Sequence, residues 1–121
     1  MKYKLSQSQI KELVRKIYEK INSDDYVILI SRDKNKKFIR EYNLNHDSIK
    51  SKILSKISIS NFVSEETDDN TLKYGIDPVA IFHIKCDLIN FLGEEKEVKV
   101  YVKIKLDEPK HIVISLHECE K

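Results

Sequence analysis

Residues 98–118, VKVYVKIKLDEPKHIVISLHE, alternate between apolar and polar side chains in two runs that flank Pro109. A period of two is typical of a β-strand with one buried face, so the segment predicts a β-hairpin. The apolar positions of the two runs are all even-numbered: Val98, Val100, Val102, Ile104, Leu106, Ile112, Ile114 and Leu116. Opposed residues share a face of the sheet, so even numbers must oppose even numbers and the loop must hold an odd number of residues.

A three-residue loop, 108–110, satisfies this condition and fixes the pairing of the polar residues. It predicts that Tyr101 lies opposite His117 and that Lys103 lies opposite Ser115. A phenol, an imidazole, an ammonium and a hydroxyl then converge on one face of the hairpin. Such a face is either an active site or an ordinary solvated sheet surface.

A second alternating stretch, residues 80–88, predicts the strand that precedes the hairpin. Its apolar face holds Phe82, Ile84 and Cys86, and its polar face holds His83 and Lys85. Consecutive strands usually pair, so these two polar side chains should join the face that carries the tyrosine.

The remaining periodic stretches predict the rest of the fold. In chain order we expect a helix over 8–21 that covers the sheet, a buried strand over 26–30, a helix after Ser31 or Asp33, a helix from Asn45 or Asp47 to Ile57, a helical turn in 58–62, and a polar loop over 65–78. The order α-β-α-α-β-β-β predicts an α+β, two-layer domain with N-terminal helices packed on a small, mostly antiparallel sheet.

The length of 121 residues predicts a single domain over 1–121. The formal charge of +2 is too small to indicate a nucleic-acid partner by itself. We interpret the basic segment 32–40 and the acidic segment 65–69 as solvated surface. Two cysteines make no disulfide framework, and the chain shows neither a signal peptide nor a long apolar run, so we expect a cytoplasmic protein without a membrane association.

The order of these pieces resembles the toxin family called motility quorum-sensing regulator (MqsR), in its Gram-positive branch. VKVYVKIKL followed by HIVISLHE is similar to a YIKLKL strand followed by an ISFHE ending in that branch. SRDKNKKFIREYNL, ILSKISISNF and AIFHI occur in the corresponding order, so the resemblance spans residues 24–118. It implies a RelE-like fold and an endoribonuclease that cuts messenger RNA without a metal or other cofactor, neutralised by a cognate antitoxin.

The resemblance also implies roles for particular residues. Tyr101 matches the family's strand tyrosine, His117 takes the basic position after the serine of the last strand, and His83 falls where the family places a polar side chain. Ser64 stands where enterobacterial members have a lysine, and Val63 replaces the tyrosine before it.

Metal-independent RNA cleavage needs a base for the 2′-hydroxyl, a cation for the phosphate and an acid for the departing 5′-oxygen. We assign the acid–base roles to His117 and His83, since imidazole titrates near neutrality, the phosphate clamp to Lys103, and phosphate positioning or proton donation to Tyr101. Further RNA contacts are expected at Lys85, Lys105 and Ser115.

Two other functions stay open at this point. The first is a non-catalytic protein-binding module, encoded on a phage or plasmid, which uses the same sheet face; the absence of the family lysine at Ser64 favours it. The second is a metal-dependent hydrolase around His117 and Cys119, which lie two residues apart on one strand face. It would need more carboxylates on that face than the sequence places there.

Overall fold

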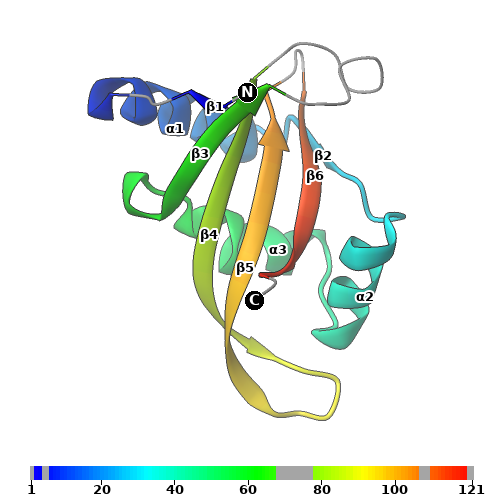
Figure 1. Cartoon of the computed structure of the whole chain (residues 1–121). Coiled ribbons are helices and arrows are strands. Elements are labelled where there is room, and N and C mark those ends of the chain that lie inside the picture. Colours follow the sequence, from blue (N-terminus) through cyan, green and yellow to red (C-terminus); the bar gives the residue numbers. More distant parts are fainter. Residues whose placement is uncertain (1, 4–5, 68–77, 107–109, 120–121) are drawn as a thin grey trace.

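The structure, a computed structural model, describes residues 2–3, 6–67, 78–106 and 110–119 of the chain. The fold is α+β, as the sequence predicts (Figure 1). Its elements, in chain order, are β1 (Lys2–Tyr3), α1 (Gln7–Asn22), β2 (Tyr26–Ile28), α2 (Asp33–Glu41), α3 (His46–Lys52), the short 3-10 helices η1 (Leu54–Lys56) and η2 (Ile59–Asn61), β3 (Phe62–Thr67), β4 (Pro78–Ile89), β5 (Glu95–Lys105) and β6 (His111–Glu118).

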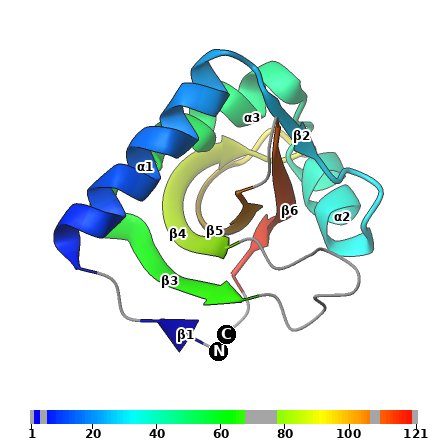
Figure 2. The same ribbon diagram turned by 90° about the horizontal axis from the view of Figure 1, so that it is seen from above.

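The strands form one mixed sheet in the order β1-β3-β4-β5-β6-β2. Only β2 and β6 pair in parallel among the described strands; the other pairs are antiparallel. β4 and β5 form a long hairpin whose turn contains Gly93, at a φ of 82° that glycine adopts without steric cost. Figure 2 shows that the sheet curls and that α1, α3 and α2 lie around its outside.

The first helix packs on the sheet, as its apolar stripe predicts. Ser6 caps α1 through a hydrogen bond from the Gln9 N–H to its hydroxyl, and the Gln9 side chain accepts from the Ser6 N–H in return. Leu13, Ile17 and Ile21 are buried in the core beneath it. Burial of a side chain the size of Ile17 contributes about 1.5–3 kcal/mol, so these three residues fix the helix on the sheet.

Besides β1, which the sequence did not predict, two segments differ from the prediction. Residues 62–67 form β3, although residues 65–67 were expected in a polar loop; the remainder of that loop, 68–77, lies outside the described residues. β3 forms because the edge of β4 offers main-chain hydrogen-bonding groups, which require no apolar side chains. The helix expected to reach Ile57 ends at Lys52, and the chain tightens into η1 while still burying Leu54.

The register of the predicted hairpin is confirmed where it matters for the polar face. Tyr101 lies opposite His117 and Lys103 lies opposite Ser115. In β4, the strand that precedes β5 in the chain, the residues alternate as expected. The register of these two strands places His83 opposite Tyr101.

A β-bulge in β6 reverses the alternation beyond this point. The register shifts after Lys103, so Ile104 lies opposite Val113 rather than Ile114. Val113 therefore enters the core and Ile112 moves to the other face, which corrects the prediction that Ile112 shares the core face. One extra residue in a strand inverts every face after it, and alternation in the sequence does not reveal the insertion.

Candidate active site on the sheet face opposite the core

Three aromatic side chains form a row across β4, β5 and β6, which lie side by side in Figure 1. The ring centroids of His83 and Tyr101 are 5.6 Å apart, and those of Tyr101 and His117 are 5.2 Å apart. The Tyr101 and His117 rings are stacked, with 11° between their planes. The structure thus brings together two predicted imidazoles with the predicted phenol between them, on the sheet face opposite the core.

The other predicted residues lie on the same face at different depths. Lys103 is half-buried, one position along from Tyr101 on this face. Lys85 is exposed and opposes Lys99. Ser115 and Lys105 are each only 7% exposed, so little of the Lys105 side chain is accessible for the RNA contact expected of it. Alternation predicts the face of a residue but not how deeply neighbouring segments cover it.

The first turn of α2 adds residues to the site that the sequence did not assign to it. Arg32 and Lys34, together with Asn35, line a cavity of about 420 Å³ that also touches Ser115 and His117. These cations belong to the basic segment that was interpreted as solvated surface. The charge of this segment is the sequence signal that could have pointed to these residues. The packing of α2 beside β6 is needed to show which of its cations line the cavity with His117.

Asn35 explains why α2 lies against β6. Its side chain is buried, at 1% exposure. The Nδ2 amide donates to the carbonyl oxygens of Leu29 and Ile114, at 2.8 and 2.9 Å, and Oδ1 accepts from the Leu116 N–H at 2.8 Å. Arg32 donates from Nη1 to the same Ile114 oxygen at 3.1 Å. The amide therefore satisfies main-chain groups around the bulge and fixes the strand end that carries His117.

A second depression lies at the His83 end of the row. It has a volume of about 560 Å³ and contains hydroxyl, amide and ammonium groups beside the phenyl ring of Phe62. Its polar and charged lining residues are Lys56, Ser58, Ser60, Asn61, His83, Lys85 and Lys99. The row of rings therefore runs between two cavities that both carry cations.

The two imidazoles differ in their surroundings. Burial lowers the pKa of His83, and the charge of Lys99 lowers it further, so the neutral ring is favoured at neutral pH. His117 Nδ1 lies 2.9 Å from the carbonyl oxygen of Glu118, which can only accept, so Nδ1 carries the hydrogen. Nε2 of His117 then remains the atom that can take or give a proton.

No group of three or more potential metal ligands occurs among the residues that the structure describes. The predicted alternative of a metal site at His117 and Cys119 therefore finds no third ligand within that part of the chain. Across the same residues, no helix combines the length and apolar character needed to cross a membrane.

No protein-family model, no curated protein and no solved structure matches this chain. Two imidazoles, a phenol and several ammonium and guanidinium groups supply general acid–base chemistry and anion binding.

Proposed function

We propose that the protein is a metal-independent endoribonuclease of the MqsR-like, RelE-like toxin type, which cleaves messenger RNA. The row of His83, Tyr101 and His117 beside Lys103 carries this proposal. The messenger RNA substrate and a cognate antitoxin partner are inferred from the resemblance of residues 24–118 to that family, and so are proposed together with the activity.

The reaction proposed is in-line attack of a ribose 2′-hydroxyl on the adjacent phosphorus. His83, neutral at physiological pH, takes the proton from the 2′-oxygen as the new O–P bond forms. His117 gives a proton from Nε2 to the departing 5′-oxygen as the old P–O bond breaks. The products are a 2′,3′-cyclic phosphate and a 5′-hydroxyl, and the two histidines exchange protonation states.

The spacing of the row suits this division of roles. In-line displacement needs the base and the acid on opposite sides of the phosphorus. His83 and His117 lie on either side of Tyr101, about two strand spacings or roughly 10 Å apart. The phenol is then placed under the phosphate, and Lys103 is beside it on β5 to offset the charge that grows in the transition state.

The cavities at the two ends of the row supply binding for the flanking RNA. Lys85 and Lys99 lie at the His83 end, while Arg32 and Lys34 lie at the His117 end. Contacts of such cations with phosphates release counterions and make binding weaken with added salt. Ser115, which lines the cavity with His117, is proposed to form a hydrogen bond with the RNA backbone.

A non-catalytic protein-binding module on the same face is the second candidate. Ser64, where enterobacterial family members have a lysine, lies in β3 and pairs with Ile81, which in turn opposes Lys103. The register thus puts the substituted position two strands from the proposed phosphate clamp. A protein that lacks this cation but keeps the surface is suited to capture another protein.

Induced expression in a bacterial host separates the two candidates. The unmodified chain is compared with His117→Ala and Tyr101→Ala at matched protein levels. Growth arrest that both substitutions relieve supports the nuclease. Normal growth with abundant folded protein contradicts it and favours the binding module.

A further inference from the structure

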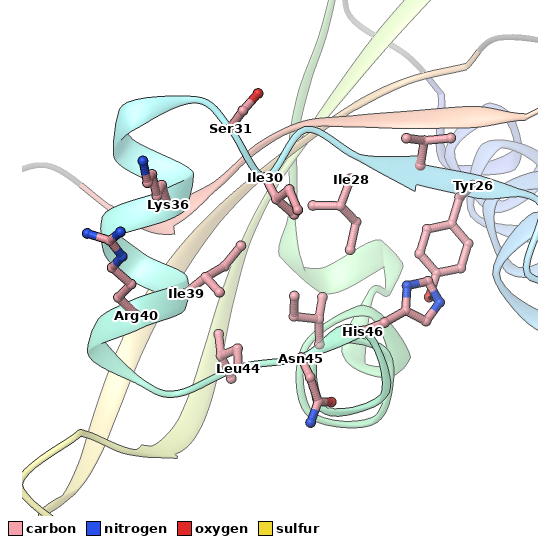
Figure 3. A pocket seen from close by; sticks show the side chains of 12 residues that line it. Tyr26, Ile28, Ile30, Ser31, Lys36, Ile39, Arg40, Leu44, Asn45 and His46 are labelled. Carbon is pink, nitrogen blue, oxygen red and sulfur yellow. Dashed lines mark hydrogen bonds between the residues drawn. The ribbon is translucent and has the colours of Figure 1, made fainter.

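An apolar pocket of about 710 Å³ lies between β2, α2 and α3, away from the row of rings. Figure 3 shows Ile39 and Leu44 extending toward Ile28 and Ile30 across it. Ile49 of α3 also lines it and is fully buried. The pocket shares only Ser31 with the cavity beside His117, so it is a separate site.

Basic groups border this pocket along α2. Lys36 and Arg40 lie four residues apart on α2, where like charges repel each other by about 0.2–0.5 kcal/mol. Neither forms an ion pair with any residue that the structure describes. The pocket lining includes no acid, although both side chains also line a neighbouring cavity with Asp33 and Glu41. A bound anion would remove this repulsion.

A stacked pair of rings closes the side opposite α2. The Tyr26 and His46 rings are 5.0 Å apart with 14° between their planes, and their Oη and Nε2 atoms are 3.0 Å apart (Figure 3). Tyr26 is only 5% exposed, which fixes this wall. Val27 and Ile30, at 44% and 61% exposure, leave apolar surface open at the rim.

We propose that this pocket binds a small amphiphilic organic anion, with its apolar body against Ile28, Ile39 and Leu44 and its carboxylate at Lys36 and Arg40. The volume lies within the range of about 300–1,000 Å³ that is typical of small-molecule sites. An apolar interior with cations at one edge favours a ligand that combines an apolar body with a negatively charged head group. The site does not depend on the proposed nuclease activity.

The test uses 8-anilinonaphthalene-1-sulfonate, a fluorescent apolar anion, with the full chain. We expect saturable binding of one dye per chain, displacement by decanoate, and no displacement by decyltrimethylammonium at the same concentration. The charge-reversed double variant Lys36→Glu/Arg40→Glu should weaken dye binding at least tenfold. Lys37→Glu, on the same helix but outside the pocket lining, should change it less than twofold.

A second variant keeps the test decisive if charge reversal disturbs the helix. Ile39→Glu places a carboxylate on the apolar wall from a residue that is only partly buried, and it should also abolish binding while near-UV circular dichroism stays native. Equal weakening by Lys37→Glu, equal displacement by the cationic decyl compound, or non-saturable binding would each overturn the proposal. So would a dimer in sedimentation that excludes the dye, because it would assign the pocket to a second copy of the chain.

Discussion

Replacement of Asn35 by alanine should destabilise the protein by about 3 kcal/mol. The amide makes three hydrogen bonds to main-chain groups of Leu29, Ile114 and Leu116. After its removal the Ile114 oxygen keeps the Arg32 guanidinium, but the Leu116 N–H loses its acceptor inside the protein. A hydrogen bond contributes about 1 kcal/mol net and an orphaned buried N–H costs about 1–3 kcal/mol, which together give the expected loss.

Urea unfolding of Asn35→Ala, with Lys37→Ala as an exposed control on the same helix, measures this loss. The control should lie within about 0.5 kcal/mol of the unmodified chain. Hydrogen exchange adds a local readout, because the Leu116 amide should lose much of its protection in Asn35→Ala. A loss below about 1 kcal/mol with the Leu116 amide still protected would refute the role given to Asn35.

Three further predictions concern single side chains. Burial, and then the charge of Lys99, lower the pKa of His83, so the unfolded state takes up a proton at this residue at a higher pH than the folded state does. As the pH drops below about 6.5, the stability of the unmodified chain should therefore fall more steeply than that of His83→Gln. Parallel stability curves from urea melts at pH 5–7 would contradict this. Phe82→Ala should cost about 4 kcal/mol in urea unfolding, because the ring is fully buried, and a cost below about 2 kcal/mol would be inconsistent with that packing. Burial raises the pKa of Cys86 to about 11, so Ellman's reagent should label Cys119 first and Cys86 only after denaturation; equal rates in the native protein would show that the Cys86 thiol is accessible.

The sequence predicts most of the polar face because strand alternation is a local property. The even-number rule placed Tyr101 opposite His117 and Lys103 opposite Ser115, and the pairing of consecutive strands placed His83 beside them. These are consequences of period two and of short connections, which neighbouring residues reveal by themselves.

The remaining features depend on contacts between distant segments. The bulge in β6 coincides with the hydrogen bonds of Asn35 and Arg32, which lie about 80 residues earlier, so alternation within residues 111–118 could not reveal it. β3 forms on the edge of β4 through main-chain groups. The burial of Lys105 likewise follows from three-dimensional packing and not from its place in the strand.

Cleavage of a labelled single-stranded RNA by the purified chain, in the presence of a metal chelator, tests the central claim most directly. Single-turnover rates are compared for the unmodified chain, His117→Ala, His83→Ala and Tyr101→Phe, with His46→Gln as a control that removes an imidazole on α3. The account predicts 2′,3′-cyclic phosphate and 5′-hydroxyl ends, a rate loss of about 100-fold or more for each histidine of the row, and little change for the control. Folded protein that leaves the RNA intact, or cleavage that survives both His117→Ala and His83→Ala, would contradict the account.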